Sequence, residues 1–283
     1  MSRIVKLGLG GSVAAALLIV LSGCTPEVQR GFLPDASGVT NHTDRIIGLW
    51  TTSWIVLLVV GVISWGLMAW ALVVYRRRRG ETGMPIQLRY NMPIETLFTV
   101  VPFILVAGFF AFTARDTAAI EAPIAEPDVH IEVIGKQWSW DFNYIDDNVY
   151  YSGVQAQFEG QEGVMDTLPT LYLPVGKTVQ LDLTARDVIH SFWVVEFLYK
   201  KDMFPGRINH MYFTPLEEGE YVGKCAELCG EYHSMMLFNV KVVSEAEYDA
   251  HMAELAAAGN VGRLGTEYDR NQNLPQDNPA IGG

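Results

Sequence analysis

The sequence predicts two membrane-spanning helices followed by an all-β domain, either a β-sandwich or a Greek-key barrel. Residues 46–75 hold no charged side chain in 30 positions, and spanning a bilayer takes roughly 20 apolar residues. Residues 96–114 form a second uncharged run. After residue 117, short apolar or alternating segments rich in Val, Ile, Phe, Tyr and Thr recur between turns, a pattern typical of β-strands.

The distribution of charge divides the chain in the same way. Hydrophobic residues make up 49% of the 283 residues although the net charge is −12, so an acidic disordered protein is excluded. Residues 1–116 carry a net +4, whereas residues 117–283 carry ten basic and 26 acidic side chains, a net −16. The second part is therefore expected to face water. Its charge argues against nucleic acid as a partner, because phosphates would be repelled.

The N-terminus resembles a bacterial lipoprotein signal. Residues 1–23 have a basic start and an apolar stretch that ends in Leu-Ser-Gly before Cys24. This pattern predicts cleavage before Cys24, lipidation of that cysteine, and an extracytoplasmic segment over residues 24–45. An uncleaved first membrane helix is the alternative, but the apolar run is short and rich in Gly and Ala.

Basic residues predict the orientation of the two spans. Four arginines at positions 76–79 directly follow the first span, residues 46–75, and basic flanks stay in the cytoplasm. Residues 76–93 are therefore expected to form a cytoplasmic loop, and residues 94–114 to return the chain outward. Everything from residue 117 onward is then extracytoplasmic.

The outer domain is expected to cover residues 117–243. Its predicted strands are 130–134, 138–144, 170–174, 178–184, 191–196, 209–214, 219–223 and 236–243, with residues 146–166 as an excursion between strands. Ser244 and Glu247 form a capping-box signal for a short helix over residues 244–258. Residues 259–283, rich in Gly, Asn, Asp and Pro, are expected to be a flexible tail.

The metal chemistry is concentrated in one twelve-residue run, Cys225-Ala-Glu-Leu-Cys-Gly-Glu-Tyr-His-Ser-Met-Met236. The side chains of Cys225, Cys229, His233 and Met236 form a soft donor set, which favours copper over hard cations. A single-copper site uses one Cys and two His, so the second Cys suits two coppers bridged by two sulfurs. A further imidazole is expected from another strand, as in cupredoxin-like barrels, and His190 is the best candidate.

Other interpretations compete with this one. A disulfide would form readily outside the cytoplasm, but it leaves His233 and Met236 unexplained. A structural zinc ion would leave the thioether idle. His190 taken alone resembles an ordinary strand histidine, and only the cysteine cluster makes it a candidate ligand. Four further histidines lack such company and are expected to be structural or exposed: His42, His130, His210 and His251.

The lipoprotein signal, the two helices and the Cys225–Met236 motif together resemble subunit II of bacterial haem–copper cytochrome c oxidases. The resemblance covers about residues 40–243. The resemblance implies a binuclear copper centre, CuA, with six ligands: His190, Cys225, Cys229, His233, Met236 and the backbone carbonyl of Glu227. It also implies that the Glu227 carboxylate binds Mg²⁺ at the boundary with subunit I, which suits a hard cation. Haem is expected only in the partner subunit, since the sequence has no Cys-x-x-Cys-His motif.

Two further roles follow from the same resemblance. Trp138, in Gly135-Lys-Gln-Trp-Ser-Trp140, resembles the family's entry point for electrons from cytochrome c, although such aromatics otherwise indicate a core strand. Glu95 resembles the glutamate at the mouth of a proton channel into subunit I. By position alone, Glu95 could equally sit among lipid headgroups and favour the helix N-terminus.

The implied function is electron transfer within cytochrome c oxidase. Electrons from a soluble or membrane-bound cytochrome c would pass through copper to haem in subunit I, where reduction of oxygen to water is coupled to proton translocation. The expected partners are subunit I, other oxidase subunits, cytochrome c and the lipids of the bacterial cell membrane. A quinol oxidase subunit II is disfavoured because it lacks the copper ligands. A membrane-anchored copper-binding or assembly protein would leave Glu95 and the aromatic stretch unexplained.

Overall fold

The computed structural model describes residues 25–84, 87–156 and 162–269. The predicted signal peptide and Cys24 lie outside the described residues. The chain divides into two compact units, Met1–Asp35 with Ile47–Leu105 and Ala36–Ile46 with Val106–Gly283.

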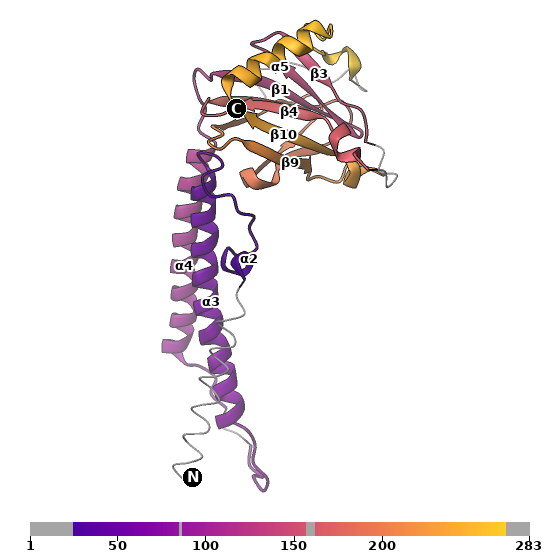
Figure 1. Ribbon diagram of the computed structural model, residues 1–283. Coiled ribbons are helices and arrows are strands. Elements are labelled where there is room, and N and C mark those ends of the chain that lie inside the picture. Colours follow the sequence, from indigo (N-terminus) through magenta and orange to yellow (C-terminus); the bar gives the residue numbers. More distant parts are fainter. Residues whose placement is uncertain (1–24, 85–86, 157–161, 270–283) are drawn as a thin grey trace. The chain divides into compact units, whose positions relative to one another are not determined.

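Two long helices, α3 (Thr43–Val74) and α4 (Met92–Ile120), follow one another along the chain (Figure 1). The first unit contains most of α3 and the part of α4 up to Leu105. Both are long and apolar enough to cross a membrane. Each is longer than the uncharged run that predicts it, because α3 begins three residues earlier, at Thr43, and α4 extends beyond its run at both ends. A short helix, α2 (Pro26–Gln29), precedes them. The chain after α2 contacts α3 at Gly31, whose carbonyl oxygen accepts a 3.0 Å hydrogen bond from the Trp50 indole N–H.

The second unit is built around two five-stranded sheets (Figure 1). In spatial order, the first sheet contains β3 (Val149–Ser152), β2 (Ser139–Tyr144), β1 (Val129–Lys136), β5 (Val179–Ala185) and β8 (Asn209–Phe213). The second contains β4 (Thr170–Pro174), β10 (Leu237–Val243), β9 (Gly219–Cys225), β6 (His190–Val194) and β7 (Tyr199–Met203). The predicted fold class, two apolar helices followed by an all-β cupredoxin-like sandwich, is confirmed.

The strand pairing departs from a simple meander in both sheets. The pairs β1–β5 and β4–β10 are parallel, and every other described strand pair is antiparallel. The parallel pairs join strands that are far apart in sequence. The β1–β5 pair brings Gly135 opposite Ala185, and so places the end of β1 beside the chain that leads into β6.

The sequence does not predict two of the strands, and both of these lie at sheet edges. β3 occupies part of the predicted excursion, and β7 has the sequence Tyr-Lys-Lys-Asp-Met. Edge strands are commonly short or charged, which prevents pairing with other chains. The apolar alternation that identifies interior strands is therefore weak in them.

Alternating burial explains the core. In β5, residues Val179, Leu181 and Leu183 are fully buried, whereas the intervening side chains are half-buried. Aromatic rings fill the space between the sheets, and the Phe192 and Phe238 rings stack with centroids 4.9 Å apart. This core supports the beginning of β6, where His190 lies.

Helix α5 (Glu245–Ala257) follows β10 and contacts β3 and β4, the edge strands of the two sheets (Figure 1). The Ser244 hydroxyl caps it by accepting a hydrogen bond from the Glu247 N–H. Residues 259–269 then differ from the flexible tail that the sequence predicts, because they are hydrogen-bonded to the first sheet. Their polar composition suggests disorder, but these polar groups have specific partners. Residues 270–283 lie outside the described part of the chain.

Candidate metal centre

Three elements bring the sulfur and imidazole groups together. His190 begins β6, Cys225 ends β9, and the loop between β9 and β10 carries Cys229, His233 and Met236. Phe192 of β6 pairs with Cys225 of β9, which places His190 close to the Cys225 thiol. All the side chains that the sequence singles out as copper ligands therefore meet at one end of the second sheet.

The donor atoms are arranged around the pair of sulfurs. The Sγ atoms of Cys225 and Cys229 lie 3.8 Å apart. His190 Nδ1 lies 3.8 Å from the Cys225 sulfur, and His233 Nδ1 lies 3.5 Å from the Cys229 sulfur. The Glu227 carbonyl oxygen is 3.2 Å from Cys225 Sγ, and Met236 Sδ is 3.8 Å from Cys229 Sγ. Each sulfur thus has one imidazole and one weaker donor beside it.

This geometry decides between the interpretations of the cysteines. Both thiols are free and buried, and 3.8 Å is far longer than the S–S bond of about 2.05 Å. The donors also exceed the four that a closed tetrahedral zinc site takes, and they include a buried thioether. Two soft thiolates, each with its own imidazole and weak donor, fit copper.

The surroundings shift the pKa values of the two thiols in opposite directions. Burial raises the pKa of Cys229 to about 12, and the neighbouring Cys225 sulfur adds to this effect. Burial also opposes ionisation of Cys225, but hydrogen bonds from His190 and from backbone N–H groups outweigh it and lower the pKa of that thiol. Two adjacent thiolates repel each other, so a bound metal is what allows both to lose their protons.

A set of residues that the sequence did not single out holds these donors. The Asp187 carboxylate lies 2.8 Å from His190 Nε2 and accepts a 2.7 Å hydrogen bond from the Gln137 N–H. The Gln137 side-chain amide donates a 2.7 Å hydrogen bond to the Cys229 carbonyl oxygen. A hydrogen bond of this kind fixes the ring orientation and the tautomer of a ligand histidine. Asp187 stands three residues before His190, which is the one sequence signal that could have identified it.

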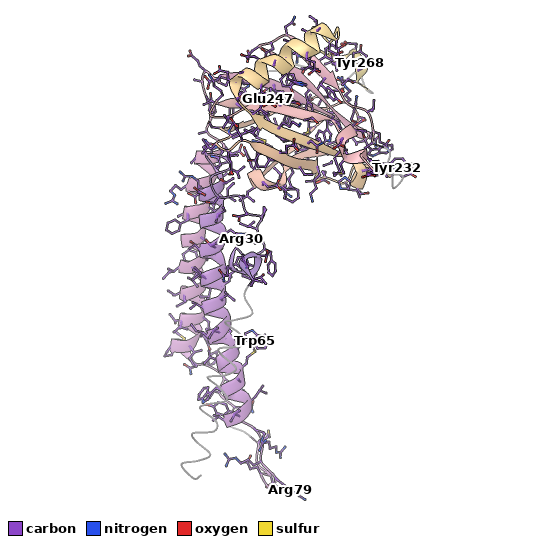
Figure 2. The ribbon with its side chains drawn as sticks, viewed as in Figure 1. Arg30, Trp65, Arg79, Tyr232, Glu247 and Tyr268 are labelled. Carbon is purple, nitrogen blue, oxygen red and sulfur yellow. The ribbon has the colours of Figure 1, made fainter. Side chains whose placement is uncertain are left out.

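Trp138 lies beside the sulfur cluster and is partly exposed. Its indole N–H donates a 3.3 Å hydrogen bond to the Cys229 carbonyl oxygen. Its ring meets that of Tyr232 edge to face, with centroids 4.9 Å apart, and Figure 2 shows Tyr232 at the end of the β domain. Trp140, by contrast, is fully buried in the core. The two tryptophans of the motif therefore have different environments, and only Trp138 connects the surface to the metal centre.

The remaining candidate side chains make other contacts or are exposed. Glu95 is in the first turn of α4, where its carboxylate accepts a 3.0 Å hydrogen bond from the Asn91 N–H, an interaction that caps the helix. The Glu227 side chain is exposed. The remaining histidines have protein partners: His42 contacts the Tyr212 carbonyl, His130 and His210 share the Asp182 carboxylate, and His251 stacks on Tyr172.

Comparison with known proteins identifies the family. Residues 129–243 match the family model described as cytochrome c oxidase subunit II, periplasmic domain. A Streptomyces avermitilis protein named probable cytochrome c oxidase subunit 2 is 45% identical, over 88% of this chain and 86% of its own length. The chain belongs to the cytochrome c oxidase subunit II family. This membership confirms the resemblance that the sequence motif indicated.

More distant members of the cytochrome c oxidase subunit II family match over a similar length. The Mycobacterium bovis protein named cytochrome c oxidase subunit 2 is 32% identical, over 86% of this chain and 80% of its own length. Among solved structures, the periplasmic domain of subunit II of cytochrome oxidase from Bradyrhizobium japonicum is 30% identical. The match covers 48% of this chain and 99% of the Bradyrhizobium japonicum chain, with a TM-score of 0.44.

Proposed function

We propose that this chain is the electron-entry subunit of a membrane-bound cytochrome c oxidase and holds a binuclear copper centre. One observation carries the proposal: two free, buried sulfurs lie 3.8 Å apart, each with its own imidazole within 3.8 Å. The proposed ligands are His190, Cys225, Cys229, His233, Met236 and the carbonyl oxygen of Glu227. When bound, such a copper pair accepts and releases a single electron.

The protein's part is to hold the donors still and to keep water away from them. His190 and Met236 are fully buried, and the two cysteines are buried as well. His190, Cys225 and Met236 belong to or adjoin strands of the core. Asp187 contacts the His190 ring, and Gln137 donates a hydrogen bond to the Cys229 carbonyl oxygen. Donors positioned by rigid strands move little when the charge of the metal changes, which suits electron transfer.

Electrons would enter at Trp138. Its partly exposed ring and its hydrogen bond to the Cys229 carbonyl provide a short covalent and hydrogen-bonded route from the surface to a ligand. The net −16 of residues 117–283 would attract a basic cytochrome c and accelerate its docking. This cytochrome c is either soluble or membrane-bound. In both cases, the negative charge of residues 117–283 favours a cytochrome c with a basic docking surface.

The remaining assignments concern the membrane and the partner subunits. The four arginines at 76–79 would keep the loop between α3 and α4 in the cytoplasm, leaving the β domain outside and a lipidated Cys24 in the outer leaflet. The exposed carboxylate of Glu227 would bind Mg²⁺ at the boundary with subunit I, which holds the haem. Glu95 would admit protons to a channel in subunit I, in addition to capping α4.

Rapid mixing of the purified oxidase with reduced cytochrome c tests the proposed role. We expect the copper absorption to bleach before the haem of subunit I is reduced. In the Cys229→Ser variant, cytochrome c should no longer reduce the haem at the wild-type rate. A membrane-anchored copper-binding or assembly protein would instead bind copper without accepting electrons from cytochrome c in turnover. Unchanged haem reduction in Cys229→Ser would refute the proposed electron route.

A further inference from the structure

Residues 259–269, here called the C-terminal strap, lie on the first sheet and are held there by paired polar groups. The Asn260 carbonyl accepts a hydrogen bond from Tyr150 of β3 (3.0 Å). Arg263 donates two hydrogen bonds to Glu132 of β1, at 2.9 and 2.7 Å. Glu132 is only 6% exposed. The strap therefore covers a charged part of the sheet rather than leaving it in water.

The end of the strap reaches Arg186, a buried arginine in the turn between β5 and β6. Arg186 Nη1 donates to the Gly265 carbonyl (2.7 Å) and to the Asp269 carboxylate (3.1 Å), and the guanidinium lies over the Tyr268 ring. On its other side, Nε donates a 3.1 Å hydrogen bond to Asp141. The Arg186 side chain is 6% exposed and that of Asp141 is 2% exposed. A buried guanidinium is tolerated only when it is paired, so the strap supplies part of what keeps it in place.

Arg186 also adjoins the two segments that contact the proposed ligand His190. Its backbone N–H donates a 2.9 Å hydrogen bond to the Gly135 carbonyl. Gly135 packs against the His190 ring so closely that an added Cβ would lie 2.9 Å from His190 Cδ2. The residue after Arg186 is Asp187, which contacts His190 Nε2 and the Gln137 N–H.

A second cationic side chain, that of Lys136 in β1, also binds the Asp141 carboxylate. Lys136 lies between Gly135 and Gln137, and its Nζ donates a 2.6 Å hydrogen bond to Asp141, the carboxylate that also holds Arg186. Asp141 thus ties residues 135–137 to residues 186–187. These are the segments that orient His190 and contact the loop that carries Cys229.

We propose that Arg186 is a positioning residue for the copper centre and that the C-terminal strap holds it in its working conformation. The inference rests on the proposed function, because it assigns these residues a role toward the proposed copper ligands. Without the acceptors of the strap, the guanidinium turns toward water, and residues 186–187 lose their fixed position against Gly135. The imidazole of His190 is then held less firmly toward the sulfurs. Partners outside the ligand shell tune the properties of a bound metal in this way.

The test uses the intact, copper-loaded oxidase purified with wild-type chain or with one of four single variants. Arg186→Gln removes the charge, Arg186→Lys keeps it, and Asp269→Asn weakens the strap's hold on it. Glu132→Gln is the matched control. It weakens the buried contact between Glu132 and Arg263 of the same strap, and Arg186 takes no part in that contact. The measurements are the thermal midpoint, the copper reduction potential, and the copper hyperfine pattern in electron paramagnetic resonance.

All four variants should lower the thermal midpoint. Only the Arg186 and Asp269 variants should also alter the copper reduction potential and the hyperfine pattern. We expect Arg186→Gln to change the equilibrium constant for copper reduction at least threefold, about 28 mV for a one-electron couple, with an altered hyperfine pattern. Asp269→Asn should cause a smaller change, and Arg186→Lys should restore most of the wild-type value. If Arg186→Gln fails to assemble, the copper reduction potential of Asp269→Asn decides whether the strap affects the copper centre.

Two outcomes would overturn separate claims. A wild-type potential and hyperfine pattern in Arg186→Gln and Asp269→Asn, or a shift of equal size in Glu132→Gln, would overturn the positioning role while leaving the copper site intact. A wild-type oxidase without a two-copper signal in this chain would instead refute the proposed function itself.

Discussion

Gly135 offers the most direct perturbation of the proposed copper site from outside its ligands. A methyl group at this position would lie 2.9 Å from Cδ2, 3.0 Å from Cγ and 3.1 Å from Cβ of His190. Ordinary carbon–carbon contacts are about 3.5–4.0 Å, so the Gly135→Ala variant forces the imidazole to move by about half an ångström or more. Overpacking of a well-packed site costs about 1–3 kcal/mol. For a domain of this size, that lowers the thermal midpoint by roughly 2–12 °C.

The assay separates loss of stability from displacement of the ligand. Gly219→Ala is the control. The atoms nearest to its added Cβ would belong to the Tyr221 side chain, at 3.3 Å, and Gly219 lies at the start of β9, whereas Cys225 is at its end. We expect Gly135→Ala to reduce bound copper or to make the two copper nuclei inequivalent in the hyperfine pattern, and Gly219→Ala to do neither. A Gly135→Ala protein with wild-type thermal midpoint and copper spectrum would show that contact with Gly135 does not set the position of His190.

Three further outcomes follow from the same structure. Trp138→Phe removes the hydrogen bond to the Cys229 carbonyl, so stopped-flow reduction by cytochrome c should slow severalfold while the copper spectrum stays unchanged; an equal rate would exclude entry at Trp138. Raising the ionic strength should slow reduction by a basic cytochrome c steeply, because screening weakens the attraction of the −16 domain; a rate independent of salt would contradict steering. The hydrogen bond to Asp182 raises the pKa of His130, so this pair stabilises the fold fully below about pH 6.5, the ordinary histidine value, and loses its effect as the pH rises through the raised pKa. Thermal midpoints above neutral pH should therefore fall less in Asp182→Asn than in the wild type.

Much of the candidate site could be predicted because its donors are contiguous in sequence. Four soft side chains fall within Cys225–Met236 in a pattern that few other sites use, and His190 could be added because such a site needs another imidazole. The two apolar helices were equally accessible, since membrane spans are defined by length and absence of charge.

The residues that support the ligands could not be predicted, because their roles depend on strand pairing. Gly135 and Arg186 become neighbours only through the parallel pairing of β1 with β5, a contact between segments about fifty residues apart in sequence. No local pattern distinguishes Gln137 or Arg186 from surface residues. The C-terminal strap shows the same limit, since its composition suggests disorder while its side chains pair with buried groups of the sheet.

Metal analysis and electron paramagnetic resonance of the purified oxidase show whether the two sulfurs bridge a copper pair. We expect two coppers bound to this chain and a spectrum in which one electron is shared equally by both nuclei. In Cys225→Ser, this signal should disappear, because one of the two bridging sulfurs is lost. A single-copper spectrum, bound zinc in place of copper, or an unchanged signal in Cys225→Ser would contradict the claim that the two sulfurs bridge a copper pair.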